Sequence, residues 1–340
     1  MVIDMMPNGG NNMNSTINYV GWRVLQVIPT LIIIILLAFG LMKLAPGDMA
    51  DVIASQSGGA SAEYMNEMRH LYGLDVPIWQ QFWHYLQSLF TLKMGYSFLY
   101  NAQVSELIFS RLPATLLLAL TAILFALVLG VLLGIVAARY RGSFVDGFIS
   151  VFSTIGFATP LFWIGLLFIV VFALWLRWLP VGGFATVGAD FPNRWAYLLD
   201  VLHHLILPAF SLSLFFLSVY VRLTRSALLD VYHQDYVRTA RAKGLTEWRV
   251  IFRHMLRNAA LPIVTLTGLE IGGLLSGSVV IETVFGWPGI GRLAYDAVLQ
   301  RDINLLLGIF LLSSLLVVAM NLLIDLLYVV LDPRIGRRRA

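Results

Sequence analysis

The sequence predicts an all-α polytopic membrane protein with six transmembrane helices. Of its 340 residues, 59% are hydrophobic and only 12% are charged, whereas a soluble domain carries about 25% charged residues. Six apolar runs are long enough to cross a hydrocarbon core of roughly 30 Å. Because no water reaches the backbone there, each run must form a helix. The runs are residues 24–44, 115–138, 148–176, 205–223, 261–284 and 305–330.

The distribution of positive charge predicts that both termini lie in the cytoplasm. Fifteen of the 23 Lys and Arg residues fall on the segments that this orientation places inside, in accord with the positive-inside rule. The N-terminal segment 1–23 and the tail 331–340 are then cytoplasmic. The same rule explains the basic pI of about 9.4, so the lipid bilayer is an expected partner and nucleic acid is not.

The region between the first two spans, residues 45–114, is too long for a turn. Helical patterning at 63–72 and 78–92 is interrupted around Gly73 and Pro77, which are residues that end helices. We therefore expect a small extracytoplasmic helical subdomain here. Residues 115–330 would form the core domain, from the second span to the sixth.

A long polar loop, residues 224–260, separates the fourth and fifth spans and is called the basic loop below. Thr239, Ala240, Arg241, Ala242 and Lys243 predict a short helix, and Gly244 is a typical residue to end it. The loop is therefore interpreted as a docking surface for a cytoplasmic partner; the alternative is that its charges only enforce topology. Eight positive residues lie in or beside it: Arg222, Arg225, Arg238, Arg241, Lys243, Arg249, Arg253 and Arg257.

Residue patterns typical of catalysis are missing from the sequence. There is no cysteine, which excludes disulfides and thiolate metal sites, and there is no GxxxxGK[ST] phosphate loop or HExxH motif. Adjacent His203 and His204 point about 100° apart on a helix, so no metal site is predicted. We expect a chain with no cofactor, no catalytic residues and no ATP site of its own.

Motifs in a fixed order along most of the chain resemble those of ABC-transporter permease subunits of the dipeptide/oligopeptide/nickel family. In the basic loop, Arg238-Thr239-Ala240 stands where the general motif has Glu-Ala-Ala, and Gly244 follows at the motif's spacing. The stretch from Glu282 to Gly291, ETVFGWPGIG, is similar to the family's motif after its fifth span. Further similarities lie at residues 44–48, 72–77, 94–98, 111–115, 179–183 and 331–335.

This resemblance implies a type I ABC importer permease fold of the B-type subunit, in a bacterial inner (cytoplasmic) membrane. A second, homologous permease subunit would complete a heterodimer. Two cytoplasmic ATPase subunits would hold ATP and Mg, and an extracytoplasmic solute-binding protein would deliver dipeptides, oligopeptides or a related small solute such as a nickel chelate. The polar N-terminal extension departs from the family pattern. The coupling helix that contacts an ATPase would comprise Arg238, Thr239, Ala240, Arg241, Ala242, Lys243, Gly244, Leu245 and Thr246.

Two acidic residues within the fifth predicted span, Glu270 and Glu282, are candidates for the substrate path, because ionisable groups in lipid are costly and usually functional. For Glu270 the alternative is a hydrogen bond to a neighbouring helix. For Glu282 the alternatives are a gate or a loop anchor. A self-sufficient secondary transporter or channel remains a second possible function, with Glu270 as its coupling acid; a membrane-embedded enzyme is disfavoured by the missing catalytic residues.

Overall fold

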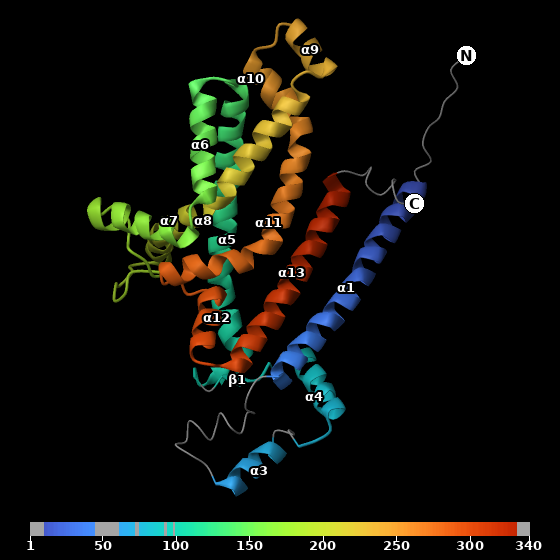
Figure 1. The fold of residues 1–340 in the computed structure, drawn as a ribbon, viewed down its shortest axis with the longest axis vertical. Helices are drawn as coiled ribbons and strands as arrows, with labels where there is room; N and C mark the ends of the chain where they lie inside the picture. The colour runs from blue at the N-terminus through green and yellow to red at the C-terminus, as the bar shows by residue number, and fades with distance from the viewer. Residues whose placement is uncertain (1–9, 45–60, 72–74, 92–93, 98, 332–340) are drawn as a thin grey trace. The chain divides into compact units, whose positions relative to one another are not determined.

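The computed structural model describes residues 10–44, 61–71, 75–91, 94–97 and 99–331 (Figure 1). Residues 1–9 of the N-terminal segment, the first part of the predicted subdomain (45–60) and the tail from 332 onward lie outside the described residues. The chain forms two compact units, which are considered separately. Unit 1 comprises residues 1–111 and 293–340, and unit 2 comprises residues 112–292.

Unit 1 is built on two long helices that pack against each other, α1 (Gly10–Leu44) and α13 (Ile303–Leu331). The short helices α3 (Ala62–Leu71) and α4 (Ile78–Phe90) lie where the sequence predicts them, within two residues. The ring of Phe39 on α1 lies 5.2 Å from that of Phe82 and 5.7 Å from that of Tyr85 (ring centroids), so aromatic side chains fix α4 on α1.

A two-stranded hairpin in unit 1 was not predicted. Its strands β1 (Tyr96–Ser97) and β2 (Ala102–Gln103) pair antiparallel. The buried Ser97 hydroxyl donates a hydrogen bond of 2.5 Å to the carboxylate of Asp302, just before α13. Strands of two residues carry too little alternating pattern to be found from sequence.

Unit 2 is a helical bundle in which α8 (Arg194–Val231) is the most enclosed helix: α6, α7 and α11 all pack against it. Figure 1 shows these helices around α8, with α9 and α10 at the end of the unit where α8 stops. The helix α5 crosses from unit 1 into unit 2, and α12 crosses back. The other bounds are α5 Val104–Arg139, α6 Phe144–Ala158, α7 Leu161–Phe168, the π-helix η1 Ile169–Trp175, α9 Asp235–Ala242, α10 Glu247–Val250, the π-helix η2 Ile251–Met255, α11 Leu256–Val284 and α12 Ile290–Leu299.

The predicted third span, residues 148–176, is not one straight helix. It is bent by 106° between Phe144–Ala158 and Leu161–Trp175. Pro160 causes the break, because proline has no N–H to donate and disfavours helical backbone in the residue before it. Thr159 accordingly adopts an extended conformation, with φ −80° and ψ 131°.

The structure contains long apolar helices of the kind that the sequence predicts to span a membrane. Within the described parts of the chain, four helices are long and apolar enough to cross a bilayer, and the bent pair would make a fifth. The predicted fifth span corresponds to α11, whose side chains at 269 and 271–277 lie outside the described residues. The count of six spans therefore stays a prediction.

Two glycines on α5 allow it to approach α8 closely. A Cβ atom placed on Gly130 would lie 2.5 Å from the Cβ of Tyr220, and one on Gly134 would lie 2.6 Å from the Cβ of Thr224 and 2.9 Å from the carbonyl oxygen of Val221. Small residues four apart are the usual means by which membrane helices come into backbone contact. This GxxxG pair sets the spacing of the two helices.

Replacing Gly134 by alanine should therefore destabilise the protein. The new methyl group would meet the backbone of α8, which cannot rotate away, so we expect a loss of about 1–3 kcal/mol. Thermal unfolding of the purified chain in detergent measures it. The matched control is Gly147→Ala on α6, where a Cβ meets nothing within 4 Å; equal stability of the two variants would contradict the prediction.

Candidate functional site

The short helix α9 at the centre of the basic loop ends as the sequence predicts. Lys243 is its C-cap, and Gly244 follows with φ +76°. This left-handed conformation suits glycine because it has no Cβ. The N–H of Gly244 donates to the carbonyl of Arg241 at 2.9 Å, which closes the last turn. The helix begins at Asp235, four residues earlier than the pattern of small residues suggested.

The inner face of α9 is part of a hydrophobic core. Val237 is fully buried and Ala240 is 4% exposed. They belong to a cluster with Ile135 and Ala138 from the end of α5, and with Leu228 near the end of α8. Burying this face fixes α9 against two of the bundle helices.

The nine predicted coupling residues, 238–246, differ in how far they are buried. Ala240 is core, and Arg241 and Leu245 are half-buried. The remaining six predicted coupling residues are exposed: Arg238, Thr239, Ala242, Lys243, Gly244 and Thr246.

Arg241 is held by its own chain rather than presented to solvent. Its Nε and Nη2 donate to the Glu247 carboxylate at 3.1 and 2.7 Å, and its guanidinium carbon lies 4.1 Å from the centroid of the Tyr232 ring. The hydrogen bonds from Arg241 hold the pKa of the Glu247 carboxyl below its ordinary value, and the positive charge of Arg139 lowers it further. Such bidentate pairs are stronger than single hydrogen bonds and fix a geometry.

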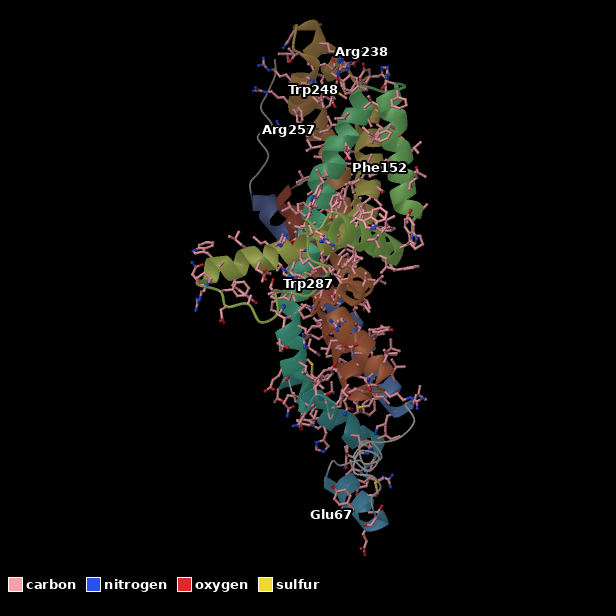
Figure 2. All side chains as sticks on the ribbon, turned by 90° about the vertical axis from the view of Figure 1, so that its left-hand side faces the viewer. Glu67, Phe152, Arg238, Trp248, Arg257 and Trp287 are labelled. Atoms are coloured by element: carbon pink, nitrogen blue, oxygen red, sulfur yellow. The ribbon has the colours of Figure 1, made fainter. Side chains whose placement is uncertain are left out.

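The positive residues after α9 form an exposed surface. Arg249, Arg253 and Arg257 are all exposed, and beside them the exposed rings of Trp248 and Phe252 stack with centroids 6.0 Å apart. Figure 2 shows Arg238, Trp248 and Arg257 at one end of unit 2, away from Trp287. These three arginines, spaced by four residues, lie in a helical segment that is partly π-helix.

Sequence reasoning missed the ion pair between Asp146 and Arg225. Arg225 was counted only as a loop charge, yet its Nε and Nη2 donate to the Asp146 carboxylate at 2.7 and 2.8 Å. The N–H of Gly142 donates to the same carboxylate at 2.9 Å. Ser143 three residues before Asp146 signals a helix start, but nothing local signals a partner on α8.

Glu282 lies fully buried at the end of α11. One carboxylate oxygen accepts from the Thr115 hydroxyl at 2.8 Å, and the other accepts from the N–H of Arg292 at 2.9 Å. The Thr115 oxygen in turn accepts from the N–H of Ile290 at 2.8 Å. A Cβ at Gly289 would lie 2.1 Å from the Glu282 carboxyl carbon, so only glycine fits there. This geometry favours the loop-anchor interpretation of Glu282.

Trp287, in the same motif, ties the turn after α11 to α5. It is fully buried, and its indole N–H donates to the carbonyl of Ala114 at 2.8 Å. A buried indole needs such a partner. Hydrogen bonds from buried polar groups thus connect the 282–291 motif to α5 at Ala114 and Thr115.

Glu270 lies elsewhere on α11. Twelve residues of helix separate it from Glu282, about 18 Å along the axis, so the two predicted path residues do not share a site. Glu270 is half-buried, and among the described residues its carboxylate has no hydrogen-bond or ion-pair partner. One turn away, Thr267 accepts a hydrogen bond of 3.0 Å from the hydroxyl of Tyr220.

His204, for which no metal site is predicted, is hydrogen-bonded through Nδ1 to the carbonyl oxygen of Asp200 at 2.8 Å.

Comparison with protein families gives the chain its place. The model of the binding-protein-dependent transport system inner membrane component matches residues 130–337, and the model of the N-terminal part of that component matches residues 16–119. The chain belongs to this family. Its members are the permease components of ABC importers, which hydrolyse ATP on separate subunits, so a self-sufficient transporter is not favoured.

Relatives of this permease extend over nearly its whole length. The oligopeptide transport system permease protein AppB of Bacillus subtilis (strain 168) is 42% identical, over 93% of this chain and 98% of AppB. The di/tripeptide permease protein DppB of Pseudomonas aeruginosa (strain UCBPP-PA14) is 39% identical, over 95% and 100%. The glutathione permease protein GsiC of Escherichia coli O6:H1 is 40% identical, over 94% and 99%.

The fold also matches a solved ABC importer. A chain of the inward-facing MetNI methionine ABC transporter superposes with a TM-score of 0.52 at 15% identity, covering 66% of this permease and 96% of that chain. The predicted all-α importer permease fold, in a multi-pass membrane protein, is confirmed.

Thr115→Val should lower the stability of the permease, because it removes the hydroxyl that bridges Glu282 and the N–H of Ile290. The replacement keeps the volume but leaves a buried carboxylate oxygen and a backbone N–H without partners, at a cost of about 1–3 kcal/mol each. Thermal unfolding measures the loss. Thr121→Val is the control on the same helix, because the Thr121 hydroxyl bonds only the Leu117 carbonyl of its own helix; an equal effect there would refute the network's contribution.

Proposed function

We propose that this permease imports short peptides, or a small peptide-like solute such as glutathione, using ATP hydrolysed on separate subunits. The observation that carries the proposal is identity of about 40% over more than nine-tenths of the chain to the oligopeptide, di/tripeptide and glutathione permeases. The chemical range of these relatives supports a peptide backbone as the common feature of the solute.

The proposed assembly contains a second, homologous permease subunit, two ATPase subunits carrying ATP and Mg, and a solute-binding protein. It lies in a bacterial inner membrane with both termini of this chain in the cytoplasm. The excess of Lys and Arg on the segments assigned to the inside supports this orientation. The binding protein would then meet the outer ends of the spans.

Coupling to ATP is proposed to occur at α9. The six exposed coupling residues on α9 and directly after it would enter a groove on one ATPase, while the buried face of α9 stays on α5 and α8. When ATP brings the ATPases together, rigid-body movement of α9 would shift the permease between inward-open and outward-open states. The charges of Arg238 and Lys243 would orient the contact more than strengthen it.

Gly244→Pro should uncouple the permease. Proline requires φ near −65° and has no N–H, whereas Gly244 has φ +76° and donates to Arg241. We expect peptide uptake to fall at least about tenfold, the effect of roughly 1.4 kcal/mol. Uptake in proteoliposomes and co-purification of the ATPase measure it. Gly188→Pro is the control, a loop glycine with φ +75° outside the site, and should retain uptake. The coupling proposal fails if the tagged chain never co-purifies with an ATPase and Gly244→Pro transports normally.

Glu270→Gln tests the proposed path residue. If the Glu270 carboxylate meets the peptide amine, its neutral replacement should reduce uptake of free-amine peptides by about tenfold or more, since a buried charge pair is lost. N-acetylated peptides serve as the internal control and should be affected little. Normal uptake together with normal substrate-stimulated ATPase activity would remove Glu270 from the path.

A further inference from the structure

Tyr232, the C-cap of α8, lies beneath two arginines from different segments. The guanidinium carbon of Arg141, in the turn between α5 and α6, is 4.3 Å from the ring centroid. That of Arg241, on α9, is 4.1 Å away. Both distances are well inside the roughly 6 Å range of cation–π attraction. The Tyr232 ring therefore contacts both the α5–α6 turn, through Arg141, and the proposed coupling helix α9, through Arg241.

The α9 side of this contact is held firmly. Arg241 binds the Glu247 carboxylate through two nitrogens, at 3.1 and 2.7 Å, and its third nitrogen donates to the carbonyl of Tyr232 at 3.4 Å. Leaving the ring would break the bond to the Tyr232 carbonyl, and the bonds to Glu247 would carry the start of α10 along with the guanidinium. The end of α9 thus moves with the start of α10 and the end of α8.

The α6 side is held as well. The turn that carries Arg141 is closed by the N–H of Gly142, which donates to Asp146 at 2.9 Å, and Asp146 is bound by both Nε and Nη2 of Arg225 on α8. Asp146 is nearly buried, with 7% of its side chain exposed. A displacement of Arg141 is therefore transferred to the first turn of α6.

Building on the function proposed above, we propose that Arg141, Tyr232 and Arg241 form a joint that passes the movement of α9 to the α5–α6 turn. They are positioning residues for transport. The apolar contact of Val237 and Ala240 with α5 resists separation but has no preferred direction. Guanidinium–ring contacts add attraction with looser geometry than bidentate hydrogen bonds, so α9 can tilt while it remains attached.

Tyr232→Leu tests the joint in the reconstituted complex with its ATPase. Leucine keeps apolar bulk but offers no ring to the two arginines. We expect the number of peptides imported per ATP hydrolysed to fall about fivefold, which corresponds to about 1 kcal/mol at 1.4 kcal/mol per tenfold. ATPase co-purification should be unchanged. Tyr232→Phe keeps the ring, so this variant should have the same ratio as the unaltered permease.

Two further variants separate the joint from a general structural effect. Arg141→Gln replaces the guanidinium over the Tyr232 ring with an amide. It should also lower the number of peptides imported per ATP, and because Arg141 is exposed it remains a test even if Tyr232→Leu folds poorly. Tyr140→Leu is the matched control, since Tyr140 is exposed in the same turn and should leave the ratio unchanged. An unchanged ratio in both Arg141→Gln and Tyr232→Leu overturns the proposal, and so does a parallel loss of uptake and hydrolysis, which would indicate impaired docking.

A measurement on the full-length permease in lipid distinguishes failure of the joint from failure of the proposed function. The chain has no cysteine, so Thr239→Cys and Phe144→Cys provide a unique pair of exposed labelling sites. Pulsed EPR should give a narrow distance distribution that broadens with Tyr232→Leu. An equally narrow distribution in that variant overturns the joint, whereas the absence of a co-purifying ATPase overturns only the proposed function.

Discussion

The absence of water inside a bilayer is the constraint on which the fold depends. Every backbone polar group there needs a partner from the protein, so interruptions in the helices are possible only where such partners exist. The end of α11 illustrates this: Glu282 accepts hydrogen bonds from Thr115 and from the backbone of Arg292, and Thr115 accepts from the first turn of α12. The chain can turn at this point because one buried carboxylate serves two segments that are distant in sequence.

At the opposite end of unit 2, the basic loop combines a small buried core with an exposed polar face. The basic loop is polar overall, yet α9 buries Val237 and Ala240 against α5 and α8 and leaves its other face exposed. Two arginines beside this small core are paired within the chain, Arg241 with Glu247 and Arg225 with Asp146. The interface proposed on this helix would act on the bundle directly, because the buried face of α9 is part of the bundle's core.

Much of this was predictable because it depends on local chemistry. The apolar runs, the helices α3 and α4 and the stop at Gly244 follow from composition, periodicity and the conformational freedom of glycine. The bend at Pro160 was missed because the run on both sides is apolar enough for one span, although a proline was visible in it. The early start of α8 at Arg194 was missed because hydropathy, not helicity, defined the predicted span. The partners of Asp146, Tyr232 and Glu282 lie 79, 91 and 167 residues away, and no local pattern identifies such partners.

The departure of this chain from the Glu-Ala-Ala motif has a physical explanation in the burial of the three positions. Ala240, which the chain keeps, is 4% exposed and packs in the core beneath α9, where a larger side chain would push the helix off α5. Arg238 and Thr239, which replace Glu and Ala, are both exposed, so their substitution costs no packing. What changes is the charge that α9 presents, from negative to positive. In the coupling proposed at α9, the ATPase groove would carry acidic groups opposite Arg238, and this charge reversal would help to exclude ATPases adapted to a Glu at that position.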